Sequence, residues 1–121
     1  MTGTDDGLGA VIVRHGGTIQ DHGGIFVETL LDDINAGRAS VGFAVYEVGS
    51  STGPTGVTKP GMEFLMLLEG SLIAEVDAKD YPMSPGDSIW FATTIPHRGW
   101  NPGDVTARAL YVNYVPTADS V

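Results

Sequence analysis

The stretch that decides the fold is residues 59–101, KPGMEFLMLLEGSLIAEVDAKDYPMSPGDSIWFATTIPHRGWN. Residues 63–70 form an apolar run that closes on Glu-Gly, which predicts a buried strand entering a tight turn. A second apolar run follows at 71–76, and a Pro-Gly turn at 85–86 introduces a third at 88–92. This succession of short runs and turns predicts a β-meander.

The rest of the chain repeats the alternation of short apolar runs and turns. The 121 residues include 17 Gly and 7 Pro, which favours an all-β domain over a helical one. Further strands are expected at 10–13, 25–31, 41–48 and 107–115, with a turn-rich loop at 32–37. About nine short strands at this spacing predict a jelly roll of two packed antiparallel sheets.

The domain organisation follows from length and composition. Residues 10–116 are expected to form one domain, which buries roughly two thirds of its unfolded surface. Residues 1–9 are small, polar and acidic and predict a disordered tail, and 117–121 predict a loose C-terminal tail. No apolar run approaches the about 18 residues of a membrane span, no signal peptide is visible, and cysteine is absent. These features are compatible with the cytoplasm.

The charge balance excludes two classes of partner. The formal net charge is −9, with only six Lys and Arg residues. Nucleic-acid surfaces need clustered basic residues to neutralise phosphates, and docking on anionic lipid needs them as well. We therefore expect neither a nucleic acid nor a membrane as partner, and a small molecule instead.

Two motifs in the central stretch resemble the signatures of the cupin superfamily. The first motif ends in a glutamate, six residues and a glycine, matched by Glu63 and Gly70. The second is matched at Gly86, His97 and Asn101. The resemblance covers roughly residues 38–115 and implies a cupin jelly-roll barrel. Where the second motif has a proline and another glycine, this chain has Ala92 and Thr94.

The first motif departs from the cupin pattern at the metal ligands. Metal-binding cupins carry His-x-His four or five residues before the motif glutamate, in what is here the glycine-rich loop 49–61. Only Glu63 and His97 would remain as ligands for Fe, Zn, Mn or Ni, and sites for such metals usually have three or more protein ligands. No cofactor is therefore expected. The two possible placements of the His-x-His pair hold Gly56 and Thr58 or Val57 and Lys59, so neither histidine is present.

The same residues are candidates for chemistry without a metal. The resemblance implies that Glu63 and His97 lie on neighbouring strands of one sheet and both point into the barrel. Burial would raise the pKa of the glutamate toward neutrality. Lys59 is a third candidate, as a cation at the pocket mouth. His15 and His22 lie in glycine-rich turns and are expected at the surface, although either would supply a further metal ligand if the N-terminal segment crosses the mouth. The expected substrate-binding side chains are Tyr46, Leu65, Trp90, Arg98 and Tyr111.

The functional prediction is a barrel that binds a small organic molecule, carrying an anionic group to meet Lys59. An enzyme of the isomerase, lyase or cyclase type, using Glu63 and His97 for proton transfer, is the first reading. A sensing module is the alternative, because the motifs most resemble ligand-sensing cupins of bacterial regulators, here without their helix-turn-helix. A metal-dependent dioxygenase is third. We also expect a homodimer, since both faces of 25–31 and 41–48 are apolar.

Overall fold

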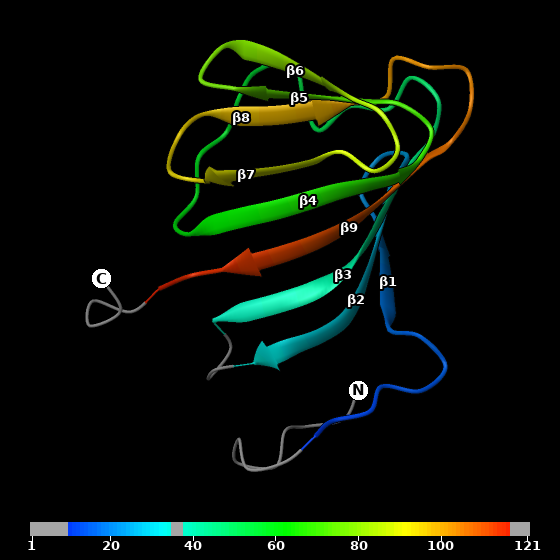
Figure 1. Ribbon diagram of the computed structural model, residues 1–121, viewed down its shortest axis with the longest axis vertical. Coiled ribbons are helices and arrows are strands. Elements are labelled where there is room, and N and C mark those ends of the chain that lie inside the picture. The colour runs from blue at the N-terminus through cyan, green and yellow to red at the C-terminus, as the bar shows by residue number, and fades with distance from the viewer. Residues whose placement is uncertain (1–9, 35–37, 117–121) are drawn as a thin grey trace.

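The protein consists of two antiparallel sheets that fold over one another (Figure 1). The computed structural model describes residues 10–34 and 38–116. The described residues form nine strands, which confirms the all-β prediction. The strands are β1 (Thr18–Asp21), β2 (Ile25–Ile34), β3 (Ala39–Tyr46), β4 (Met62–Glu69), β5 (Leu72–Val76), β6 (Lys79–Met83), β7 (Ser88–Ala92), β8 (His97–Trp100) and β9 (Ala107–Tyr114).

The larger sheet has six strands in the order β1-β2-β3-β9-β4-β7, and the smaller has three in the order β6-β5-β8. All neighbouring strands run antiparallel. The smaller sheet lies at the top of the view in Figure 1, with the larger sheet curving beneath it. None of the described residues belongs to a helix long and apolar enough to cross a membrane.

The predicted β-meander is wrong, because β4 and β5 belong to different sheets. β4 pairs with β7 and β9, whereas β5 pairs with β6 and β8. The chain changes sheets at Gly70, which has φ 82°. A Cβ at this position would lie 2.8 Å from the Cα of Ala107. Glycine is therefore required both for the left-handed backbone and for the close approach of β9.

The core lies between the two sheets and is filled by alternate residues of their strands. On β3, Gly42, Ala44 and Tyr46 are buried and face inward, because side chains alternate across a strand. On β4 the corresponding inward residues after Glu63 are Leu65 and Leu67. The central cluster contains Ile25, Ala44, Tyr46, Leu65, Leu67, Leu72, Ala74, Met83, Ala107, Ala109 and Tyr111.

Several local predictions need correction. Residues 10–13 form no strand, and the strand expected at 25–31 continues to Ile34, into the predicted loop. The polar segment after β5 is a hairpin, because Asp77 and Ala78 both adopt positive φ (54° and 63°) as a tight turn into β6. The predicted tails 1–9 and 117–121, and residues 35–37 of the predicted loop, lie outside the described residues.

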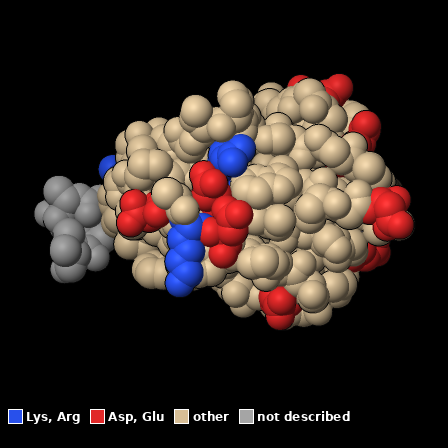
Figure 2. Space-filling view, turned by 90° about the horizontal axis from the view of Figure 1, so that it is seen from above, with Lys and Arg blue, Asp and Glu red and all other residues tan. Residues whose placement is uncertain are grey.

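Charged side chains are sparse on the face that carries the smaller sheet. Figure 2 shows acidic and basic groups next to one another there, surrounded by side chains of neither kind. Arg98 and Glu75 form an ion pair with 3.0 Å between Nε and Oε1. Both are partly exposed, so the pair contributes little to stability.

The outer face of the larger sheet carries a row of apolar side chains across four strands. Trp90 on β7 lies opposite Phe64 on β4, which lies opposite Val112 on β9, which lies opposite Val41 on β3. Trp90 is 63% exposed and Val112 is 36% exposed. The homodimer stays a prediction, and this row is an apolar surface that a second copy would cover.

Trp90→Glu is expected to shift the protein from dimer to monomer. The substitution places a charge at the most exposed side chain of the apolar row, twice in a two-fold interface, and leaves the core untouched. Light scattering at micromolar concentration measures the mass. Val105→Glu is the matched control, because Val105 is 56% exposed and lies in a loop away from the row. A wild-type mass of a single chain would contradict the prediction.

Candidate functional site

A cavity of about 400 Å³ lies between the two sheets. Its size falls at the small end of the range for sites that bind small molecules. Apolar side chains make up much of the wall, and a few polar groups project into it. The lining residues are His22, Ile25, Val27, Ala44, Tyr46, Thr52, Val57, Lys59, Glu63, Leu65, Leu72, Ala74, Phe91, His97, Arg98, Gly99, Tyr111 and Asn113.

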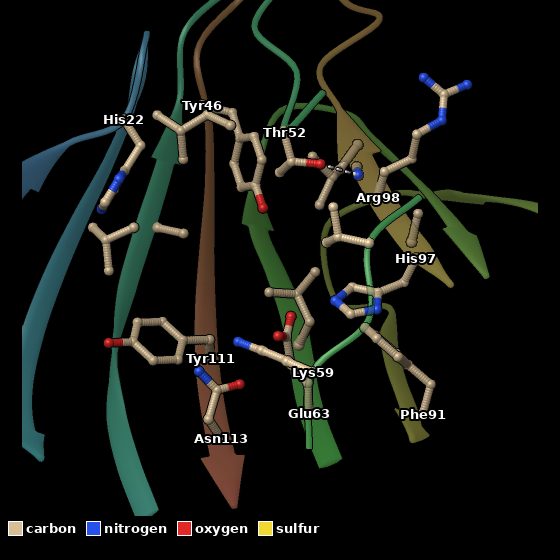
Figure 3. A pocket seen from close by; sticks show the side chains of 18 residues that line it. His22, Tyr46, Thr52, Lys59, Glu63, Phe91, His97, Arg98, Tyr111 and Asn113 are labelled. Atoms are coloured by element: carbon tan, nitrogen blue, oxygen red, sulfur yellow. Dashed lines mark hydrogen bonds between the residues drawn. The ribbon is translucent and has the colours of Figure 1, made fainter. Parts of the chain in front are cut away.

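Glu63 and His97 face this cavity from different sheets. Glu63 is the second residue of β4 in the larger sheet, and His97 is the first residue of β8 in the smaller sheet. Figure 3 shows both side chains turned into the same space. They also lie near one another, because the strand partner of Glu63 is Phe91, whose ring packs against His97. The expectation that they lie on neighbouring strands of one sheet is therefore wrong, but one ligand in the cavity would lie beside both side chains.

The His97 ring is held by its own chain and by an aromatic neighbour. Its Nδ1 lies 3.0 Å from the carbonyl oxygen of Ile95. A carbonyl only accepts, so Nδ1 carries a hydrogen and the neutral ring presents its other nitrogen, Nε2, as an acceptor. The ring also packs at a tilt against Phe91, with 5.2 Å between centroids. This second contact limits ring rotation.

The carboxyl group of Glu63 has altered acidity. Burial raises the pKa of Glu63 above its ordinary value, and the charges of Lys59 and His97 offset part of that rise. Figure 3 shows the Lys59 side chain directed toward the Glu63 carboxylate. The wall therefore carries a carboxyl group with a raised pKa, beside the ammonium group of Lys59 and the imidazole of His97.

Lys59 is placed by backbone hydrogen bonds within the irregular loop 49–61. Its own N–H donates to the Thr93 carbonyl at 2.9 Å. Two residues earlier, Val57 and His97 exchange both backbone bonds, at 2.9 and 3.0 Å. The guanidinium of Arg98 also donates to the carbonyl of Gly53 at 3.2 Å. The loop thus runs along the edge of β8 and brings Lys59 to the cavity.

Glu63→Gln is expected to raise the melting temperature at pH 7.5 by about 2–6 °C, the scale of ~1 kcal/mol. A carboxyl group with a raised folded-state pKa contributes stability at low pH, and this is lost as pH rises from about 4 through the folded pKa. The glutamine cannot ionise, so the gain should shrink at pH 5. Thermal unfolding at both pH values, with exposed Glu69→Gln as control, measures it. A lower melting temperature for Glu63→Gln at pH 7.5 would contradict this reading.

Four of the five expected substrate-binding residues line the cavity: Tyr46, Leu65, Arg98 and Tyr111. Their contact with a substrate stays a prediction. The prediction for Trp90 is wrong, because Trp90 does not line the cavity. Side chains alternate along β7, so Phe91 points inward and Trp90 points outward.

Arg98 lines the cavity, but Figure 3 shows its guanidinium pointing away from it. The guanidinium is paired with Glu75 and lies over the ring of Trp100, 4.5 Å from the centroid. It also donates to the carbonyl of Gly53, so Arg98 helps to hold loop 49–61 against β8.

Sequence reasoning missed part of the wall. His22, expected at the surface, is exposed but also lines the cavity from the turn between β1 and β2. Asn113 on β9 lies opposite Glu63 in the strand register and faces the same side, which the period of two on β9 would have indicated. Its Oδ1 is buried without a hydrogen-bond partner. By contrast, Asn101 of the second motif is structural, because its Nδ2 donates to the carbonyls of Tyr46 and Val105.

The residues of the cavity do not fit a metal centre. Within residues 10–34 and 38–116, no three His, Cys, Asp or Glu side chains are grouped so that they could hold an ion. His22 shares the cavity with Glu63 and His97 without forming such a group, and His15 does not line it. Val57 and Lys59 occupy the loop where a cupin metal site would have histidines. We therefore derive no reaction step through a metal, and the expectation that no cofactor is used stays a prediction.

A sequence profile of the cupin domain matches residues 42–113, which is more than half of the chain. The chain belongs to the cupin superfamily. This confirms the resemblance seen in the two motifs. No protein of curated function shows significant sequence similarity to this cupin.

Solved structures show the same fold. A sugar phosphate isomerase of the cupin superfamily from Silicibacter pomeroyi is 26% identical over 77% of this chain, with a TM-score of 0.64. The chain spans 60% of the length of that protein. A predicted oxalate decarboxylase from Thermotoga maritima is 19% identical over 88% of this cupin and 99% of its own chain (TM-score 0.73). The cupin domain of a transcriptional regulator from Enterobacter cloacae is 16% identical over 78% of this cupin and 99% of its own chain (TM-score 0.69).

Proposed function

We propose that this cupin is an enzyme that moves protons on a small organic anion, in an isomerisation, elimination or cyclisation. The observation that carries the proposal is that Glu63 and His97 face one cavity of about 400 Å³ from opposite sheets. Two groups that accept and donate protons beside one substrate can move a proton between two of its atoms. The similarity to the Silicibacter sugar phosphate isomerase supports the same class of reaction.

The chemistry uses the two groups in turn. The Glu63 carboxylate accepts a proton from the substrate, and its raised pKa makes it a stronger base than an exposed carboxylate. His97, with Nδ1 bonded to the Ile95 carbonyl, accepts or returns a proton through Nε2. The apolar wall of the cavity strengthens the interaction of these groups with a charged substrate.

The test is turnover against binding. The protein is incubated with a panel of sugar phosphates and small hydroxy and keto acids in D₂O, and ¹H NMR follows each compound. An enzyme replaces substrate protons by deuterium or forms new signals. If a compound binds, as shown by line broadening, but stays unchanged for hours, the chain is a binding module. The similarity to the regulator domain from Enterobacter cloacae favours that second candidate.

The proposal that the substrate carries a negative charge rests on Lys59. Lys59→Met is expected to weaken binding of a carboxylate or phosphate ligand by roughly 10–100-fold, the scale of a hydrogen bond to a charged group. Isothermal titration calorimetry measures the affinity. Lys79→Met is the matched control, because Lys79 lies over the ring of Tyr81 outside the cavity. Equal affinity of Lys59→Met and wild type for every anion would contradict the assignment.

A further inference from the structure

Two tyrosines line the cavity, and their hydroxyl groups differ. The hydroxyl of Tyr111 shares a hydrogen bond of 3.1 Å with Oγ1 of Thr29. The hydroxyl of Tyr46 has no hydrogen-bond partner among the described residues. The Tyr46 side chain extends from β3 to β8. Its hydroxyl oxygen would lie 4.0 Å from the Cβ atom of any larger residue at Gly99. The Tyr46 O–H is therefore a donor that the protein itself leaves unused.

The surroundings keep this hydroxyl protonated. Tyr46 is only 8% exposed, and burial raises the pKa of its hydroxyl. The negative charge of Glu63 raises the same pKa by a smaller amount. Figure 3 shows the hydroxyl directed into the space that Glu63 and His97 also face. A donor that faces the cavity and has no partner in the protein is available to an acceptor on a ligand.

We propose that Tyr46 donates its hydrogen bond to a carbonyl oxygen of the substrate, and that the substrate is a small carbonyl compound with a carboxylate or phosphate group. The inference rests on the proposed function and names its substrate class. Lys59 binds the anionic group, and the carbon next to the carbonyl lies within reach of Glu63. A neutral donor aimed at the oxygen stabilises it most when negative charge develops there.

The reaction step is an enolisation. The C–H bond next to the carbonyl breaks, and its proton passes to the Glu63 carboxylate. The electron pair of that bond forms a carbon–carbon double bond, while the π pair of the carbonyl moves onto oxygen. Tyr46 holds the resulting enolate oxygen by its O–H and keeps its proton. In an α-hydroxy carbonyl compound such as dihydroxyacetone phosphate, the hydroxyl on the deprotonated carbon then gives its proton to the enolate oxygen through His97. Glu63 returns its proton to the former carbonyl carbon, which moves the carbonyl to the neighbouring carbon without any oxidant.

The experiment is deuterium exchange at the carbon next to the carbonyl. Pyruvate, 2-oxobutanoate and dihydroxyacetone phosphate are incubated in D₂O, and ¹H NMR measures the loss of the exchanging signal. The two keto acids and the phosphate ester distinguish a carboxylate from a phosphate ligand. Wild type is expected to accelerate exchange of at least one of them. Tyr46→Phe should lower that acceleration by about 10²–10³-fold, the typical loss of one oxyanion donor.

Matched variants separate this role from a structural one. Tyr81→Phe should exchange like wild type, because Tyr81 lies on β6 outside the cavity. Tyr46→Phe should also keep the wild-type melting temperature, since it removes no hydrogen bond of the free protein. Tyr111→Phe should lower the melting temperature, because it removes the bond to Thr29. A fall in melting temperature for Tyr46→Phe would show that its hydroxyl is already paired and would overturn the inference.

The other outcomes distinguish the inference from the proposed function. If Tyr46→Phe exchanges as fast as wild type while Glu63→Gln does not, Tyr46 is not the donor and acid–base catalysis stands. If wild type accelerates none of the three probes, the carbonyl assignment is wrong, and the NMR panel of other anions still decides the function. If Glu63→Gln and His97→Asn both exchange at the wild-type rate, the proposed function fails.

Discussion

Glu63→Gln and His97→Asn should each lower turnover by on the order of 10²–10⁴, the typical loss of a general acid or base. Both replacements keep the size and hydrogen-bonding character of the side chain but cannot move a proton. Because the two residues face the cavity and do not belong to the central apolar cluster, the fold should be retained. The rate is measured on the compound that the NMR panel identifies, with circular dichroism as the check on folding.

The controls for this prediction use the same residue types outside the cavity. Glu69 ends the strand that Glu63 opens, and it is exposed. His15 is exposed and has φ 65°, which asparagine tolerates. Glu69→Gln and His15→Asn should therefore keep wild-type turnover. If Glu63→Gln binds the ligand more weakly but turns it over at the wild-type rate, Glu63 binds the substrate and does not catalyse.

Leu67→Ala should cost about 3–5 kcal/mol of unfolding free energy, the largest stability effect expected in this protein. Leu67 is 0% exposed and lies in the central cluster. Its backbone is fixed by bonds from its N–H to Asp87 and from Gly86 to its carbonyl, both within 2.9 Å, so the strand cannot readily move to fill the space. Urea denaturation measures the change. Exposed Val105→Ala is the control, and a loss below ~1 kcal/mol for Leu67→Ala would mean that the core collapses around the deletion.

The fold class could be predicted from the sequence because short apolar runs and glycine or proline turns are local features that indicate strands. The Pro-Gly turn that ends at Gly86 has the expected positive φ, of 95°, and apolar runs became strands at β4, β7 and β9. The strand pairing could not be predicted in this way. A glycine turn between two apolar runs occurs both in a hairpin and in a crossing between sheets. Only the long-range pairing of β4 with β9 and of β5 with β8 distinguishes the two.

The candidate site was predictable where a motif position fixed the side of the strand. Glu63 and His97 were assigned to the cavity on that basis, but the sheet that carries His97 depends on pairing with β5, which is a long-range contact. Trp90 was assigned by residue type, and a shift of one residue in strand alternation exchanges it for Phe91. Tyr46 was named as a binding residue, but the position of its hydroxyl in the cavity depends on long-range packing between β3 and β8.

The measurement that tests the central claim most directly is the turnover of the double variant Glu63→Gln/His97→Asn. If the two side chains act on one substrate in one proton transfer, removing the second adds little once the first is lost, because groups that act as a unit are non-additive. The account predicts a double variant within about tenfold of the slower single variant. It is contradicted if the two losses multiply in full, or if either single variant turns over as fast as wild type.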